Sequence, residues 1–241
     1  MDLGLDGRIA LVTAGSRGLG FATARALAGE GVRLVVSARG KDTLESAAAS
    51  LRSLGAEVAT RVADMADPDV PDRLVAAAAD EFGGLDIVVA NAGGPPVARS
   101  LDVTEDQLDA ALNLNLRSSI RLIRAAVPVL RDRGWGRICC ITSYSVVQPV
   151  PTLALSNTAR VGLWAWAKSA AQDLASEGGG ITLNLACPGP HATDRMKELG
   201  GSGAMGDPAD FGKVVAFLCS QPAGYINGAA VVVDGGATLA L

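Results

Sequence analysis

The residues Thr13-Ala14-Gly15-Ser16-Arg17-Gly18-Leu19-Gly20 form a glycine-rich segment between a predicted strand and a predicted helix. The strand is the apolar run 8–13, and the helical pattern covers 19–29. Glycines in such a turn let the backbone approach a pyrophosphate, and the N-terminus of the following helix favours that anion. The segment therefore predicts a dinucleotide site, with a purely structural strand-to-helix connection as the alternative.

β-branched runs alternate with Ala- and Leu-rich helical patterns along the whole chain. The predicted strands cover 8–13, 32–37, 57–62, 85–90, 136–142, 180–186 and 229–233. The predicted helices cover 19–29, 41–54, 70–82, 105–131, 153–177 and 208–220. This alternation is typical of βαβ units and of a sheet covered on both faces. We therefore expect an α/β fold: one doubly wound domain over 1–241 with a mostly parallel, seven-stranded sheet.

Composition and charge exclude several classes of protein. Of the 241 residues, 49% are hydrophobic and 19% are charged, and the net charge of -4 leaves no basic surface for nucleic acid. No apolar run approaches the ~18 residues of a membrane span, and the N-terminus lacks a signal-peptide pattern. The sequence predicts a cytoplasmic protein without nucleic-acid or membrane partners. The cysteines show no CxxC spacing, so we expect buried small side chains and no metal site; they are Cys139, Cys140, Cys187 and Cys219.

A series of motifs over residues 7–236 resembles the short-chain dehydrogenase/reductase family, and the layout is similar to that of its 3-oxoacyl-carrier-protein reductases. The glycine-rich turn matches the family's Thr-Gly-x-x-x-Gly-x-Gly, except that Ala14 stands at the first glycine. The other matching motifs are Asp64 before Met65, Asn91-Ala92-Gly93, Pro188-Gly189 followed by Thr193, and Asp234-Gly235-Gly236. The resemblance implies a three-layer, Rossmann-type fold that binds a nicotinamide dinucleotide.

The resemblance also implies positions for the ligands and the subunits. Asp64 is expected beside adenine, Asn91-Ala92-Gly93 along the cofactor, and the segment 188–193 under the nicotinamide. A loop at about 190–207 is expected to cover the substrate, and the protein to form a homodimer or homotetramer. The predicted cofactor-binding residues are Gly15, Ser16, Arg17, Gly18, Leu19, Gly20, Arg39, Asp64, Met65, Asn91, Ala92, Gly93, Arg160, Pro188, Gly189 and Thr193.

The choice between the two nicotinamide cofactors follows from charge at the end of the second predicted strand. A carboxylate there would accept the ribose hydroxyls of NAD and repel a 2′-phosphate. The position holds Ser37-Ala38-Arg39, without an acid. Arg39 and Arg17 are suited to clamp a 2′-phosphate, although two solvated surface arginines are the alternative. The sequence therefore predicts NADP(H) over NAD(H), bound with a small-molecule substrate.

The catalytic positions depart from the family's pattern. In the family, a tyrosine exchanges a proton with the substrate oxygen, a serine holds that oxygen, a lysine binds the ribose and lowers the phenol pKa, and an asparagine maintains a proton path. Asn115 and Ser143 match the asparagine and the serine. The usual spacing places Ser156 at the tyrosine and Arg160 at the lysine, so the family's proton donor is missing.

This loss limits the chemistry that we expect. A phenol has a pKa of about 10, which a nearby cation lowers, whereas a serine hydroxyl is a far weaker acid and an arginine hardly releases its proton. Ordinary ketone reduction is therefore expected to be slow. Hydride addition to a conjugated enone needs no strong acid, because Ser143, Ser156 and a cation can stabilise the enolate while water protonates its carbon.

Three other residues are candidates for the missing role. His191 is predicted near the nicotinamide, where an imidazole transfers protons at neutral pH or simply fills the floor of the site. Tyr144 follows Ser143, but alternation along an extended strand would turn it away. Lys168 lies two helical turns, ~12 Å, beyond Arg160 and is expected to be solvated.

The sequence thus predicts an NADP(H)-dependent oxidoreductase that reduces a small carbonyl or conjugated enone without a tyrosine. Two alternatives stay open: a nucleotide-binding protein that has lost hydride transfer, and a non-redox isomerase or cyclase. The substrate loop is short and contains Arg195 and Lys197, which are either contacts to an anionic substrate or solvated charges.

Overall fold

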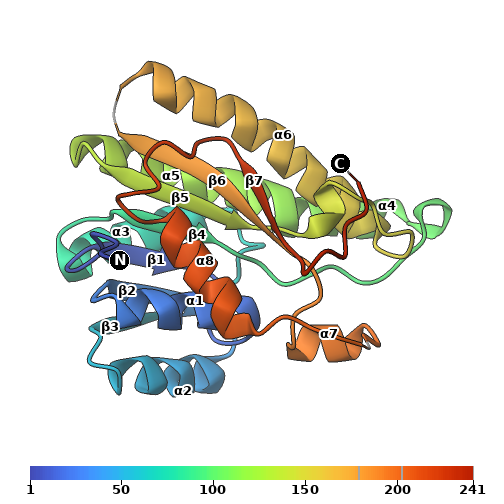
Figure 1. Ribbon diagram of the computed structural model, residues 1–241, viewed down its shortest axis with the longest axis horizontal. Helices are drawn as coiled ribbons and strands as arrows, with labels where there is room; N and C mark the ends of the chain where they lie inside the picture. The colour runs from blue at the N-terminus through green and yellow to red at the C-terminus, as the bar shows by residue number, and fades with distance from the viewer. Residues whose placement is uncertain (179, 202, 241) are drawn as a thin grey trace.

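The computed structural model describes residues 1–178, 180–201 and 203–240, which form a three-layer α/β domain (Figure 1). Its seven strands are β1 (Ile9–Val12), β2 (Arg33–Ala38), β3 (Val58–Val62), β4 (Ile87–Ala90), β5 (Gly136–Ile141), β6 (Ile181–Pro188) and β7 (Ala230–Val233). They form one sheet in the order β3-β2-β1-β4-β5-β6-β7. Every pair of neighbours is parallel, which confirms the predicted doubly wound sheet.

Helices cover both faces of the sheet. One face carries α1 (Gly18–Gly29), α2 (Lys41–Arg52) and α8 (Pro208–Leu218), and the other carries α3 (Val70–Phe82), α5 (Ser118–Asp132) and α6 (Ala154–Ser176). The shorter elements are η1 (Ser100–Asp102), α4 (Glu105–Leu112), η2 (Asn113–Arg117), η3 (Tyr144–Val146) and α7 (Asp194–Glu198). No helix in the described residues is both long and apolar enough to cross a bilayer.

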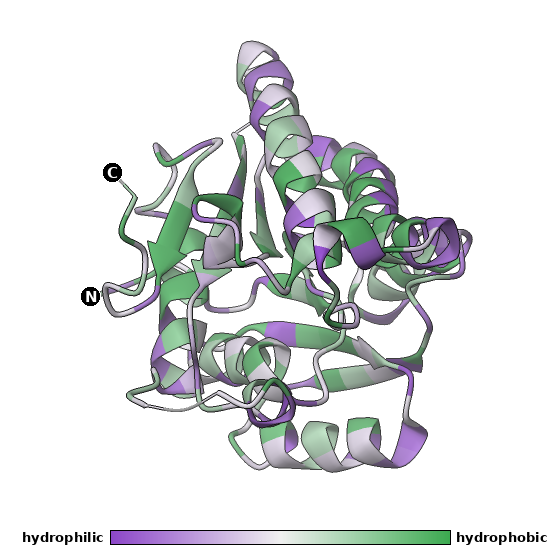
Figure 2. Cartoon of the chain, turned by 90° about the vertical axis from the view of Figure 1, so that its right-hand side faces the viewer, coloured by the Kyte–Doolittle hydropathy of each residue, from purple (hydrophilic) through white to green (hydrophobic). Residues whose placement is uncertain are grey.

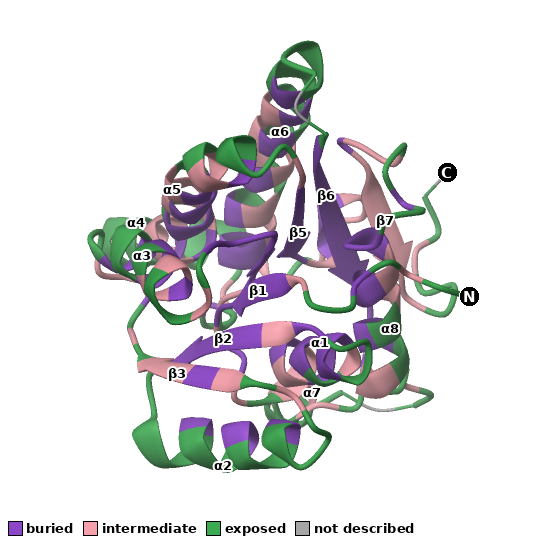
Figure 3. Cartoon of the chain, turned by 90° about the vertical axis from the view of Figure 1, so that its left-hand side faces the viewer, coloured by how far each residue is buried: buried purple, intermediate pink, exposed green. Residues whose placement is uncertain are grey.

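Hydrophobic periodicity explains this layering. In β1, Ala10 and Val12 pack in the cluster under α1, α2 and α8, whereas Ile9 and Leu11 pack in the cluster under α3, α5 and α6. Figure 2 shows hydrophobic strands between helices whose outer turns are more hydrophilic. Helix α2 has a single buried face, as Figure 3 shows, because its apolar residues recur at helical spacing; they are Leu44, Ala47, Ala48 and Leu51.

The four cysteines are free thiols buried in the core, as the sequence predicts. Burial raises the pKa of the Cys140 thiol, and it raises the pKa of Cys187 to about 11. These thiols are therefore protonated at neutral pH and unreactive as nucleophiles.

The predicted helix over 105–131 is wrong as a single element. It is interrupted by η2, a π-helical segment in which the Ser118 N–H donates to the Asn113 carbonyl five residues earlier. A π-bulge adds one residue to a turn and changes which side chains face inward. A second difference is α7, a short helix in the region predicted as a loop, where the Thr193 hydroxyl accepts the Met196 N–H at 3.3 Å and so caps the helix.

The glycine-rich turn holds its alanine in a strained conformation. Ala14 has φ 46°, and it is the one residue other than glycine with positive φ among those described. The next residue has no room for a side chain, because a Cβ on Gly15 would lie 2.7 Å from Val36 Cγ1. A left-handed conformation costs a residue with a Cβ about 1–2 kcal/mol. The turn therefore keeps the shape that glycine favours although Ala14 replaces that glycine.

We predict that Ala14→Gly increases the free energy of unfolding by about 1 kcal/mol, because glycine adopts positive φ without this strain. Urea unfolding followed by circular dichroism measures the change. The control is Ala49→Gly on the exposed face of α2, which should lower stability by about 1 kcal/mol. A loss of stability in Ala14→Gly would show that the alanine is not strained.

Candidate active site

A crevice is expected where the strand order reverses, between β1 and β4, because their connections run in opposite directions. Thr13 joins the two strand ends: its hydroxyl donates to the Asn91 carbonyl at 2.7 Å and accepts the Asn91 N–H at 2.9 Å. The Asn91 amide donates to the Ala14 carbonyl at 3.2 Å. A Cβ on Gly20 would lie 2.5 Å from both that carbonyl oxygen and the Asn91 amide nitrogen. The glycine-rich turn and the Asn91-Ala92-Gly93 motif thus lie side by side and form one rim of the expected crevice.

The N-terminus of α1 fits an anionic dinucleotide. Arg17 precedes the helix in an extended conformation, and no side chain caps the first turn. The free N–H groups there provide donors for a pyrophosphate. Thr193 lies across from them, since a Cβ on Gly18 would be 3.8 Å from its Cγ2. The structure thus brings Thr193, at the end of the predicted 188–193 motif, to the glycine-rich turn.

The adenine end of the predicted site lies at the ends of β2 and β3. Asp64 is exposed, and its carboxylate accepts the Ala66 N–H at 3.0 Å; Met65 beside it is buried. Arg17 and Arg39 are both exposed, and neither forms a salt bridge in the part of the chain that the structure describes. Both guanidinium groups are therefore available to an anion.

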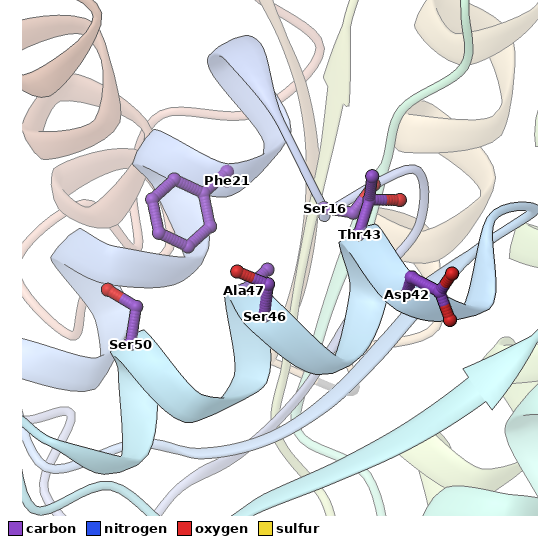
Figure 4. Close-up of a pocket in the computed structure, with 7 residues that line it drawn as sticks. All are labelled: Ser16, Phe21, Asp42, Thr43, Ser46, Ala47 and Ser50. Atoms are coloured by element: carbon purple, nitrogen blue, oxygen red, sulfur yellow. The ribbon is translucent and has the colours of Figure 1, made fainter.

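A groove between α1 and α2 begins at this end of the turn (Figure 4). Its lining is largely hydroxyl-bearing and includes Ser16 from the turn and the acid Asp42 from the first turn of α2. The remaining lining residues are Phe21, Thr43, Ser46, Ala47 and Ser50. None of the predicted catalytic residues lines it, so this groove is separate from the reaction centre.

The π-helical segment positions Asn115. Its amide nitrogen donates to the Gly93 carbonyl at 2.8 Å, and its amide oxygen is buried without a partner. Asn113, two residues earlier, donates to the Ala66 carbonyl at 2.8 Å and accepts from Arg121 at 2.9 Å. Sequence reasoning missed Asn113, since nothing in a regular helical pattern marks a residue that ties η2 to the turn after β3.

Arg160 connects the first turns of α6 to the carboxyl end of β5, beside Ser143. Arg160 Nη1 donates to the Thr142 carbonyl, next to Ser143, and Arg160 Nε is buried without a partner. Ser156 is buried on α6, one helical turn before Arg160 and on the same face. The Ser143 hydroxyl accepts the Ser145 N–H at 3.1 Å. The guanidinium of Arg160, which is partly buried, thus lies near the hydroxyl-bearing residues Ser143 and Ser156.

Burial changes the acid–base behaviour of Arg160. Desolvation lowers the pKa of its guanidinium to about 10; nearby Cys187 opposes this shift and the positive charge of Arg195 adds to it. Arg160 nevertheless remains protonated at neutral pH. It supplies a permanent positive charge and does not act as a proton donor.

His191 is buried and held by its surroundings. Its Nδ1 lies 3.0 Å from the Gly189 carbonyl oxygen, and its ring packs edge-on against Phe211 with centroids 5.2 Å apart. A Cβ on Gly206 would lie 2.8 Å from His191 Nε2. These contacts are those of a side chain that fills the base of the substrate loop, which is one of the two interpretations that the sequence left open.

The structure also places the two other candidates for the missing role, Tyr144 and Lys168. Tyr144 begins the 3₁₀ helix η3, because the chain leaves the strand after Ile141. The expected alternation along an extended strand is therefore wrong at Tyr144. Lys168 is exposed on α6, as the sequence predicts.

The predicted substrate loop, 190–207, is bonded to the loop that follows β4. From α7, Arg195 Nη2 donates to the Pro95 carbonyl at 2.6 Å, on the loop that follows Gly93. The base of the substrate loop is closed by the Gly206 N–H, which donates to the Pro190 carbonyl at 2.9 Å. Figure 1 shows α7 apart from both helical layers.

Comparisons with known proteins agree with this arrangement. The family model described as enoyl-(acyl carrier protein) reductase matches residues 13–238. The chain is 35% identical over 246 residues to human dehydrogenase/reductase SDR family member 4, covering 96% of this chain and 88% of that protein. It is 31% identical over 248 residues to human dehydrogenase/reductase SDR family member 2, mitochondrial, covering 97% and 88%.

Solved structures lead to the same family. L-Sorbose reductase from Gluconobacter frateurii, complexed with NADPH and L-sorbose, matches with a TM-score of 0.93 at 30% identity, covering 100% of both chains. A putative short-chain alcohol dehydrogenase from Sinorhizobium meliloti matches with a TM-score of 0.91, also at 30% identity and with 100% of both chains covered. Together with the turn, the sheet order and the crevice, these matches show that the chain belongs to the short-chain dehydrogenase/reductase family of oxidoreductases.

Proposed function

We propose that this protein is an NADP(H)-dependent reductase that acts on a small carbonyl compound, preferably a conjugated enone, without a catalytic tyrosine. One observation carries the proposal: the guanidinium of partly buried Arg160 binds the backbone beside Ser143 and lies one turn from Ser156, so the site offers a positive charge and hydroxyls, with no tyrosine at position 156. The bound NADPH of the L-sorbose reductase supports the choice of cofactor.

The residues present fit the cofactor. The uncapped N-terminus of α1 suits its pyrophosphate, and Arg17 and Arg39 suit a 2′-phosphate. The buried, unpartnered atoms Asn115 Oδ1 and Arg160 Nε have hydrogen-bonding capacity left for a ribose or an ordered water. When bound, the cofactor supplies a hydride.

The chain's own groups would handle the charge that this transfer creates. When hydride adds to the β-carbon of an enone, the electron pair of the C=C bond shifts to form a new double bond between the α-carbon and the carbonyl carbon, and the π pair of the carbonyl moves onto its oxygen, which gives an enolate. The hydroxyls of Ser143 and Ser156 donate to that oxygen, and Arg160 adds a fixed positive potential. Water then protonates the α-carbon, which yields the saturated ketone. No step needs a proton from a side chain with a pKa near neutrality.

Matched substrates test the proposal. We expect the protein to oxidise NADPH with 2-cyclohexen-1-one and to leave cyclohexanone almost unchanged, measured as loss of absorbance and by product analysis. Product formation without NADPH oxidation would instead indicate the isomerase or cyclase alternative. NADPH binding with no turnover across a panel of enones and ketones would indicate the nucleotide-binding alternative.

We also propose that the protein acts as a homodimer or homotetramer. Trp164 and Trp166 on α6 are half-buried in the described chain, and Val161 one turn earlier is 39% exposed. Val161 and Trp164, three residues apart, share one face of α6, and a partner subunit packed there would bury their exposed parts.

We predict that Arg39→Ala weakens NADPH binding by about tenfold or more and changes NADH binding less than about twofold, because a charge-assisted hydrogen bond to the 2′-phosphate is lost. Titration calorimetry measures both affinities. Arg124→Ala, an exposed arginine on α5 in the opposite helical layer, is the matched control and should change neither affinity. Equal weakening of NADPH and NADH would refute the phosphate clamp.

We predict that Ser156→Tyr combined with Arg160→Lys increases ketone reduction by about 10²-fold or more, since general acid catalysis typically contributes about 10²–10⁴. Steady-state NADPH oxidation with cyclohexanone measures the gain. The control pairs Ser156→Phe with Arg160→Lys, which restores the ring without the acidic hydroxyl. Equal rates in the tyrosine and phenylalanine variants would contradict the role assigned to the missing phenol.

A further inference from the structure

Arg195 is fixed across the crevice by contacts to the opposite rim. Its Nη2 donates to the Pro95 carbonyl at 2.6 Å, and a Cβ on Gly94 would lie 3.2 Å from its Nε. The residue is half-buried, and its guanidinium lies against the backbone. A freely solvated guanidinium would not be bonded to a backbone carbonyl or lie this close to Gly94, so the Arg195 side chain is part of the rim.

The position of Arg195 separates it from the pyrophosphate end of the crevice. Thr193, two residues earlier, is the part of the substrate loop that lies beside Gly18 and the N-terminus of α1. Arg195 instead reaches Gly94 and Pro95, the residues after Gly93, whose carbonyl accepts from Asn115. Arg195 therefore lies beside the same loop that binds Asn115.

The three cations on this side of the molecule differ in their acidic partners. Among the described residues, Arg195 pairs with one acid, Glu198, at 3.4 Å, and the Glu198 side chain is 59% exposed. Lys197 is paired with Asp194 at 3.1 Å on the outer surface, where their side chains are 77% and 71% exposed. Arg160, which is partly buried, has no salt bridge among the described residues.

The two arginines also influence each other. Desolvation is the main cause of the lowered pKa of Arg160, and the positive charge of Arg195 adds to it. Two like charges near each other favour the binding of an anion. A planar guanidinium with several N–H donors binds a carboxylate in a bidentate manner.

We propose that Arg195 binds a carboxylate of the substrate, so that the enzyme acts on enones or ketones that carry an acid group close to the reacting carbonyl. That the bound acid is the substrate rests on the proposed function. That a carboxylate binds there is argued from the contacts of Arg195 with Gly94 and Pro95. On binding, the guanidinium exchanges part of its contact with Glu198 for the carboxylate.

Binding to the NADPH-loaded protein tests the inference without relying on turnover. The probes are pyruvate, 4-oxopentanoate and 4-oxo-4-phenylbutanoate, each compared with its methyl ester by titration calorimetry. We expect at least one acid to bind about tenfold tighter than its ester, which corresponds to about 1.4 kcal/mol. Absence of a preference in all three pairs would overturn the proposal.

Variants then assign the preference to one residue. Arg195→Gln should bring the acid and its ester to within about twofold while NADPH affinity is retained, because only the charge-assisted contact is removed. Lys197→Gln, the neighbouring cation that is paired on the outer surface, should keep the full preference. A preference that survives in Arg195→Gln would overturn the assignment.

The two hypotheses fail in different ways. Selective binding of an acid with no NADPH oxidation on any enone or ketone would refute the proposed function and leave the carboxylate site standing. Turnover of enones with equal affinity for acids and esters would refute the carboxylate site and leave the reductase standing.

Discussion

The buried hydroxyl of Thr13, bonded to both backbone groups of Asn91, is the constraint from which the rest of the site follows. It holds the carboxyl ends of β1 and β4 together at the point where the strand order reverses. The loop that leaves Asn91 then supplies successive attachment points for the site. The Gly93 carbonyl receives Asn115, and the Pro95 carbonyl receives Arg195. One loop therefore sets the positions of the turn, the π-helical segment and the substrate loop relative to one another.

Much of the fold could be predicted from the sequence because it follows from local periodicity. All seven strands and the helix over 70–82 are where the apolar patterns place them. The π-helical segment could not be predicted, because its cause is tertiary: the amides of Asn113 and Asn115 bind backbone carbonyls 47 and 22 residues away in the chain. Helix α7 is too short to show a 3.6-residue period, so its only signal is the capping residue Thr193.

For the predicted site residues, too, some features follow from local sequence patterns and others from tertiary contacts. Spacing identifies Ser156 and Arg160, but it does not reveal that Arg160 binds the Thr142 carbonyl and keeps a buried N–H without a partner. It also gives no sign that Arg195 reaches Pro95, which is 100 residues away. Those facts depend on which backbone carbonyls the folded strands and loops present, and no short-range pattern encodes them.

A fixed charge and a titrating acid favour different reactions. A phenol returns a proton to the oxygen that becomes negative, so it serves ketones, whose alkoxide is strongly basic. A buried guanidinium only lowers the energy of that negative charge, which is sufficient when the charge is delocalised, as in an enolate. An anionic substrate would neutralise such a field if its carboxylate approached Arg160 directly. In the proposed reaction, Arg195, which is bonded to the Pro95 carbonyl on the opposite rim, holds the substrate carboxylate. Arg160 then keeps its positive potential for the negative charge that develops on the carbonyl oxygen during hydride transfer.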